Sequence, residues 1–251
     1  MGKGYFCSVF YTLLYSKGKM KKLMIMAFLA VCMTANAGNL FSNDGSDSKK
    51  DLVLKSGKNG DLTMHFGLGV NLVSGAPEGY EFAPFKSWDF QWTVAQYDYN
   101  PKGAGQTYSI GLGLNWRRYG LKDNNTMFEK VHDVVGLGKF VSDAGSRHSN
   151  VHTLGVNIPL LFTQKLGKSS SFSLGPVFNF NVGGWVENEW EVGDQTMDVS
   201  TRKIGQRTFT VDALGMIDFG GLAIFCKYSP MKVFEDGRGP ELKSFTVGLY
   251  F

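Results

Sequence analysis

A serine and several histidines lie close together near the middle of the chain, and their types suit them to catalysis. Ser149 stands between His148 and His152, and His132 precedes them in the same polar segment. A hydroxyl activated by an imidazole is the usual nucleophile of ester and acyl hydrolysis. No catalytic motif surrounds the group, and geometry defines such a site. Ser149 and His152 therefore define one functional alternative, an acyl hydrolase acting at a membrane surface.

The spacing of residues indicates neither a metal site nor a cofactor site. The His, Cys, Asp and Glu residues do not follow the ligand spacing of metal sites. Gly-x-Gly pairs occur at Gly67/Gly69 and Gly111/Gly113, but a dinucleotide site needs a helix directly after its glycines, and none is indicated. We expect neither a metal nor a cofactor.

The first 37 residues have the features of a secretory signal peptide. Basic residues follow Met20, an apolar run covers 23–33, and Ala35-Asn36-Ala37 forms a small-residue cleavage site. The apolar run is shorter than the roughly 20 residues that a membrane-spanning helix requires. We expect cleavage after Ala37, with residues 1–19 lying upstream of the true start of translation.

Removing the leader changes the charge of the protein. The chain has 26 basic and 22 acidic residues, and the leader holds five of the basic residues and none of the acidic ones. The mature part thus has 21 basic against 22 acidic residues, a formal charge of −1, so no nucleic-acid partner is expected. It retains one of the three cysteines, Cys226, which has no internal disulfide partner.

Beyond a polar lead-in at 38–60, expected in the periplasm, the chain alternates between apolar and small polar residues. A period of two over this length predicts β-strands. The segments with this pattern are 61–72, 88–95, 107–116, 154–162, 172–182, 209–219, 222–228 and 245–251. The prediction is eight strands, with 209–219 the least regular because Leu214 and Met216 fall on the opposite face.

The composition of the two strand faces indicates a membrane. One face is dense with Leu, Ile, Val and Phe, and the other is mostly Gly, Ser, Thr and Asn with little charge. A polar interior inside an apolar exterior fits a closed antiparallel eight-stranded transmembrane β-barrel over 61–251. The links between strands are alternately long and short, and an even strand number places both termini in the periplasm. Aromatic residues near the strand ends fit the girdles at the two membrane interfaces.

Charged residues on the interior face need partners. An eight-stranded barrel is just wide enough to be filled by its own side chains, and buried charges require opposite charges. Asp89, Arg117 and Asp212 are expected to form a polar network in the lumen, beside Asp218 and Lys227. We interpret this network as a structural plug, and a narrow pore is the alternative.

The segment 184–206 is the most acidic link of the chain. Glu187, Glu189 and Glu191 alternate there, which indicates that the flanking strands continue past the membrane as a hairpin. A solvated loop is the expected environment for such a charge run, and a cation or a partner surface is the alternative.

The C-terminal residues 244–251 resemble the assembly signal of bacterial outer-membrane proteins, an alternating strand that ends in Phe. The matching positions are Phe245, Val247, Leu249 and Phe251. The resemblance implies that the barrel-assembly machinery recognises this strand.

Two further stretches, 156–161 and 227–231, resemble the small outer-membrane barrel domains of Bacteroidetes often called PorT-like. This resemblance implies a barrel in a Gram-negative outer membrane and, for some members, a role in secretion or gliding machinery. Pro159 lies in the first stretch and gives no N–H to a strand ladder, so a local bulge is expected there.

The sequence thus predicts an integral outer-membrane β-barrel with a structural, surface-contact or envelope-assembly role and no catalytic activity. The expected partners are outer-membrane lipid, the assembly machinery during insertion and an envelope-complex protein.

Overall fold

A computed structural model describes residues 54–56, 60–101, 105–141, 145–167 and 169–251 of this chain. The described residues belong to one compact unit, residues 51–251. Among them, no helix is long and apolar enough to cross a membrane. The expected signal peptide and most of the expected lead-in lie outside the described residues.

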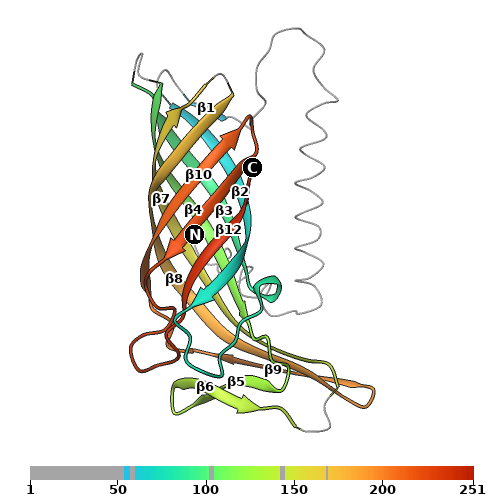
Figure 1. The fold of residues 1–251 in the computed structure, drawn as a ribbon. Helices are drawn as coiled ribbons and strands as arrows, with labels where there is room; N and C mark the ends of the chain where they lie inside the picture. Colours follow the sequence, from blue (N-terminus) through green and yellow to red (C-terminus); the bar gives the residue numbers. More distant parts are fainter. Residues whose placement is uncertain (1–53, 57–59, 102–104, 142–144, 168) are drawn as a thin grey trace, which may run out of the picture. The chain divides into compact units, whose positions relative to one another are not determined.

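Eight antiparallel strands pair in a ring (Figure 1). They are β2 (Gly60–Ser74), β3 (Trp88–Tyr99), β4 (Gln106–Gly120), β7 (Arg147–Lys165), β8 (Ser170–Val192), β10 (Phe209–Phe219), β11 (Ala223–Ser229) and β12 (Lys243–Tyr250). Each pairs with its neighbours in this order, and β2 pairs with both β12 and β3, so the pairing returns to its starting strand. These eight strands are the eight that the alternating pattern predicts.

The apolar face of each ring strand points outward. Large apolar side chains from all eight strands are exposed there, among them Leu68, Tyr97, Ile110, Leu112, Leu160, Leu174, Val182, Ile217, Ile224, Val247 and Leu249. The small polar residues of the same strands are buried inside, as Asn71, Asn115 and Asn179 illustrate. The strict period of two produces this arrangement because successive side chains of a strand point to opposite faces.

The links alternate in length around the ring, as predicted. Short links follow β3, β7 and β10, and long links follow β2, β4, β8 and β11. At the shortest link Gly220 and Gly221 take positive φ angles of 84° and 114°, which glycine adopts without steric cost. The side chain of Asp218, predicted in the lumen, instead accepts hydrogen bonds from both glycine N–H groups and caps this turn.

The long links contain more structure than the pattern predicts. The link after β4 holds a separate hairpin, β5 (Thr126–Val131) and β6 (Val134–Lys139). The link after β8 contains β9 (Gln195–Arg202), which pairs with an extension of β8, so the predicted hairpin exists and uses a strand distinct from β10. A short strand, β1 (Leu54–Ser56), pairs with β2, and a 3-10 turn, η1 (Pro84–Lys86), precedes β3.

Pro159 is accommodated without the predicted bulge. The pairing of β7 with β4 keeps one register on either side of it, from Ile110↔Leu160 to Gly113↔Asn157. Pro159 faces Gly111, where an added Cβ would lie 2.8 Å from the proline ring. A glycine opposite the ring therefore provides the space that a register shift would otherwise have to supply.

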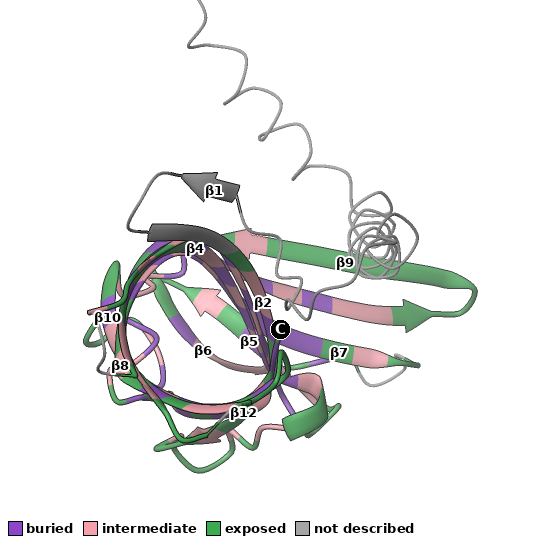
Figure 2. Ribbon diagram, turned by 90° about the horizontal axis from the view of Figure 1, so that it is seen from above, coloured by how far each residue is buried: buried purple, intermediate pink, exposed green. Residues whose placement is uncertain are grey.

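Seen from above, the strands enclose a ring (Figure 2). Its interior is layered along the ring axis. An apolar cluster, the plug, fills the end with the short links; it consists of Leu161, Val177, Leu214, Met216, Ala223, Phe225 and Tyr250. A polar layer follows. A second apolar cluster, the cap, lies at the end with the long links; it consists of Tyr119, Leu121, Phe128, Val135, Val151, Val186, Ile204, Val233, Phe234 and Leu242. The buried charged side chains are therefore confined to the middle of the interior, between two apolar clusters that the sequence, which predicts a polar lumen, does not indicate.

Close packing of the polar layer makes its glycines sensitive to substitution. A Cβ on Gly113 would lie 2.5 Å from the Trp92 carbonyl oxygen and would collide with Asn157 Oδ1. Since overpacking costs about 1–3 kcal/mol, Gly113→Ala should lower the free energy of unfolding by that amount, measured by urea unfolding in detergent micelles. Gly136→Ala is the matched control, because nothing lies within 4 Å of its added Cβ. Equal urea midpoints for the two variants would contradict this packing.

Candidate functional site

The polar layer of the ring brings together the three predicted network residues and Lys227. Arg117 lies between two carboxylates: its Nε is 3.2 Å from Asp89 Oδ2, and its Nη2 pairs with Asp212 Oδ2. Lys227 Nζ lies 2.6 Å from the same Asp89 oxygen. All four side chains are at most 5% exposed. Two cations and two carboxylates make this layer neutral, as burial demands.

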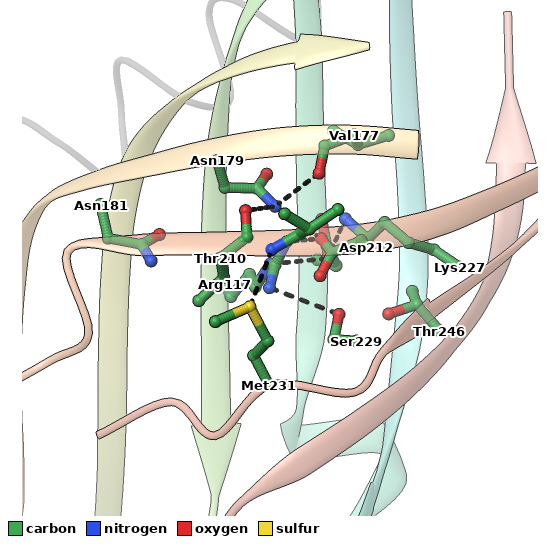
Figure 3. Close-up of polar contacts among 12 residues, drawn as sticks. Arg117, Val177, Asn179, Asn181, Thr210, Asp212, Lys227, Ser229, Met231 and Thr246 are labelled. Atoms are coloured by element: carbon green, nitrogen blue, oxygen red, sulfur yellow. Dashed lines mark hydrogen bonds and ion pairs between the residues drawn. The ribbon is translucent and has the colours of Figure 1, made fainter. Parts of the chain in front are cut away.

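Neighbouring strands supply further polar contacts to the network (Figure 3). Asn179 Nδ2 donates to Asp212 Oδ2 at 2.8 Å, and Arg117 Nη1 donates to Ser229 Oγ at 3.5 Å. Beside Arg117 a cavity of about 10 Å³ remains, bordered by Thr210 and Met231 among others. That volume is about the space of one water molecule. The layer is therefore a filled, charge-paired part of the interior.

The cap joins all four long links into one packed structure. Phe128 of β5 contacts the rings of Tyr80 and Phe82 in the link after β2, with ring centroids 6.1 Å apart in both cases. Val135 of β6 donates its N–H to the Arg238 carbonyl in the link after β11, at 2.8 Å. In the link after β8, Gly205 accepts the Glu235 N–H at 2.8 Å. The long links thus form an ordered platform.

Ser149 holds the β5–β6 hairpin to this platform. Its hydroxyl donates to Asn188 Oδ1 at 2.6 Å and accepts the Phe128 N–H at 2.8 Å. Asn188 Nδ2 in turn donates to the Phe128 carbonyl at 2.8 Å. Ser149 is 4% exposed. Its hydroxyl therefore has a structural role, holding Phe128 and Asn188 together. The sequence does not indicate this role, because these partners lie 21 and 39 residues away along the chain.

His152 lies on the opposite face of β7 from Ser149, since their positions on the strand differ by three, an odd number. Its Nδ1 accepts a hydrogen bond from Trp116 Nε1 at 3.1 Å, and its Nε2 is 3.1 Å from Glu187 Oε2. The ring stacks on Trp185 with centroids 4.9 Å apart. Both ring nitrogens are thus engaged, and the structure does not bring Ser149 and His152 together.

The other histidines are placed apart from one another. His65 stacks on Tyr250 at the plug end of the ring, with centroids 5.4 Å apart. His132 occupies the tight turn between β5 and β6. His148 is exposed and lies 3.3 Å from the Ser146 hydroxyl. Within the described parts of the chain, no group of three or more His, Cys, Asp or Glu residues could hold a metal ion.

The C-terminal strand carries its predicted signal residues on the outer face. Phe245, Val247, Leu249 and Phe251 are each 39–48% exposed. Between these positions Thr246 points inward and donates to Asn71 Oδ1 at 2.6 Å. β12 lies between β11 and β2, so this strand joins the two ends of the ring.

Fold and interior define the chain as an eight-stranded antiparallel ring with a filled interior. No family model matches the sequence, and no curated protein matches it. Among solved structures it is similar to Ail, the attachment invasion locus protein of Yersinia pestis, at 10% identity and a TM-score of 0.35. A second Ail structure, in complex with the heparin analogue sucrose octasulfate, gives 12% and 0.37. Both cover 77% of this chain and all of Ail. Scores this low leave fold and function to be decided from the residues of this chain.

Removal of Arg117 should destabilise the ring strongly. Arg117→Met would leave the carboxylates of Asp89 and Asp212 buried with Lys227 as their remaining cation, and breaking a buried pair on one side costs about 3–5 kcal/mol. We expect this loss in the free energy of unfolding from urea titration in micelles. Adding Asp212→Asn to Arg117→Met should recover part of it. An unchanged free energy of unfolding in Arg117→Met would show that the network does not stabilise the ring.

His152 should make folding stability depend on pH. It lies on β7 beyond Leu154, outside the predicted membrane-spanning segment, and burial lowers its pKa below the ordinary 6.5, opposed by Glu187 and assisted by Arg118. The unfolded chain therefore takes up a proton at a higher pH than the folded chain does. The stability that neutral His152 contributes is complete above about pH 6.5 and is lost as the pH falls toward the lowered folded pKa.

The measurement is the free energy of unfolding at about pH 7.5 and about pH 5.5, on either side of the ordinary histidine pKa. The decrease at the lower pH should be smaller in His152→Gln than in the unchanged chain. The control His148→Gln, at an exposed histidine, should leave the decrease as it is. Identical decreases in all three proteins would contradict the assignment to His152.

Proposed function

We propose that this protein is an integral outer-membrane β-barrel whose ordered long links form a contact surface outside the cell, without catalytic activity. The observation that carries the proposal is the belt of exposed apolar side chains around the ring. Soluble monomers rarely expose apolar patches beyond a few hundred Å². A surrounding bilayer covers such a belt, and a ring of paired strands satisfies the backbone polar groups there.

Aromatic pairs near the two ends of the ring support this placement. Trp88 and Trp116 contact each other toward the long links, with centroids 5.0 Å apart, and Tyr108 and Phe162 do so toward the short links, at 5.5 Å. Aromatic side chains of this kind favour the interfaces between lipid and water. The long links then face outward, and both chain ends lie in the periplasm, in line with the expected signal peptide.

A contact role is supported by the organisation of the cap. Links that only connect strands need no shared core, whereas three of these links contribute seven of the ten buried apolar residues of the cap, and residues of the fourth link pack against them. A surface that is ordered in advance loses less conformational entropy when a partner binds. The engaged side chains of Ser149 and His152 favour this role over an acyl hydrolase. Because the plug and the cap fill the two ends of the interior, we do not propose a conducting pore.

The partners follow from this proposal. Lipid surrounds the belt, and the assembly machinery would bind β12 through the exposed alternate residues that end at Phe251. An envelope-complex protein of the kind that PorT-like barrels serve would meet the platform at the long links. The expected absence of a nucleic-acid partner rests on the near-neutral charge of the mature chain.

The proposed orientation predicts which end of the ring a reagent reaches from outside the cell. Asp194→Cys, in the turn between β8 and β9, should react with a membrane-impermeant maleimide on intact cells. Leu166→Cys, exposed in the short link after β7, should react only after the outer membrane is permeabilised. Both are made in a Cys226→Ser background, because Cys226 is exposed on the outer face of β11.

Folding of each variant is checked by the mobility shift between unboiled and boiled samples of the outer-membrane fraction. Labelling of Leu166→Cys but not Asp194→Cys on intact cells would reverse the orientation. Recovery of the protein in the soluble periplasmic fraction would overturn the membrane placement altogether.

A further inference from the structure

The β9 strand is the edge of a small sheet that continues past the ring. The ends of β7 and β8 extend beyond their ring partners, and β9 pairs with β8 over eight residues, from Val192↔Gln195 to Trp185↔Arg202. Figure 1 shows these strands leaving the ring at the end with the long links. No strand within the described ranges pairs with the other edge of β9. The sheet therefore ends in a strand edge that another chain can extend.

The hairpin geometry shows which backbone groups this edge offers. A two-residue turn joins β8 and β9, so Val192 and Gln195 form a hydrogen-bonded pair, and such pairs then alternate along the strands. The backbone of Glu191 supports this alternation. Its N–H donates to the Ser146 carbonyl and its carbonyl accepts the Gly145 N–H, both on the side away from β9. The N–H and C=O groups of Thr196, Ser200 and Arg202 consequently face away from β8.

The β9 edge lacks three of the usual protections against pairing, namely proline, lysine and a bulge. Exposed edges in native proteins are commonly blocked by proline, lysine or a bulge. Residues 195–202 contain neither proline nor lysine. Their pairing with β8 runs without a register shift. An edge of this length without such devices is a site for strand addition.

The side chains of the hairpin specify the chemistry of an added strand. Residues 185–202 contain five acidic residues and one basic residue, a formal charge of −4. Glu189 and Glu191 lie on one face of this sheet. The other face presents exposed Val192, Met197 and Val199. An added strand alternates between the two faces, so it meets carboxylates with one set of side chains and apolar groups with the other.

From this arrangement we infer that the β9 edge binds an extended segment of a partner protein in which basic and apolar residues alternate. Main-chain hydrogen bonds to residues such as Ser200 give affinity, and the two faces give specificity. A second copy of this chain does not fit, because pairing two hairpins of charge −4 brings like charges together. The inference rests on the proposed orientation, which places β9 outside the cell.

The test uses the full chain folded in lipid nanodiscs and a fluorescent octapeptide of alternating Lys and Val. Fluorescence anisotropy should show binding that weakens roughly tenfold between low salt and half-molar salt. Ser200→Pro should weaken binding at least about tenfold, since proline removes an outward N–H but spares the pairing with β8. Ser200→Ala is the matched control and should bind within about twofold of the unchanged chain, because it keeps that N–H.

Further arms separate strand addition from adsorption by charge. An octapeptide of alternating Glu and Val, which reverses the charge, should bind at least about tenfold more weakly. The same loss is expected for Lys–Val octapeptides N-methylated at every second residue, in either register, because they lack the N–H groups that pair with the edge. Equal binding of the N-methylated peptides, equal binding to Ser200→Pro, or no binding by the unchanged chain would each overturn the inference. If Ser200→Pro does not fold, as judged by its mobility shift, Thr196→Pro replaces it.

Failure of this inference is distinguishable from failure of the proposed function. Maleimide labelling of Asp194→Cys on intact cells reports the orientation of the ring and does not depend on peptide binding. Binding in nanodiscs, where both faces of the bilayer are accessible, reports the β9 edge and does not depend on orientation.

Discussion

The narrow width of an eight-stranded ring is the constraint on which the rest of the structure depends. Such a ring has room inside only for its own side chains, so every inward residue must be small, apolar and well packed, or paired. Arg117 shows the consequence, because its charge is buried between Asp89 and Asp212 and balanced further by Lys227. The same lack of space makes glycine necessary opposite bulky inward groups, as with Gly111 and Pro159.

The plug, the polar layer and the cap each stabilise a different part of the ring along its axis. The plug fills the end with short links by apolar packing. The polar layer joins β3, β4, β10 and β11 through charges that have few alternative partners, which favours a single arrangement of strands. The cap extends the core into the long links, so that residues distant in sequence, such as Tyr80 and Phe128, share one apolar cluster. This continuity from ring to links makes an ordered outer surface physically reasonable.

Ser149 and His152, the candidate catalytic pair, make two separate sets of structural contacts for a simple geometric reason. Residues three apart on a strand face opposite ways, so Ser149 binds Phe128 and Asn188 on one side while His152 binds Trp116 and stacks on Trp185 on the other. Ser149 and His152 are close along the chain, but both lie on β7, which begins at Arg147, ahead of the predicted strand 154–162.

By itself the sequence determined the eight ring strands, their inward and outward faces and the alternation of link lengths, because a period of two is a local property of the backbone. It also indicated that Asp89, Arg117 and Asp212 face inward. Only the tertiary structure decided that these three meet, that Leu214 and Phe225 belong to a plug, and that Phe128 rests on Ser149. Those contacts join residues far apart in the chain, and their distances follow from strand register and ring closure, which no local pattern records.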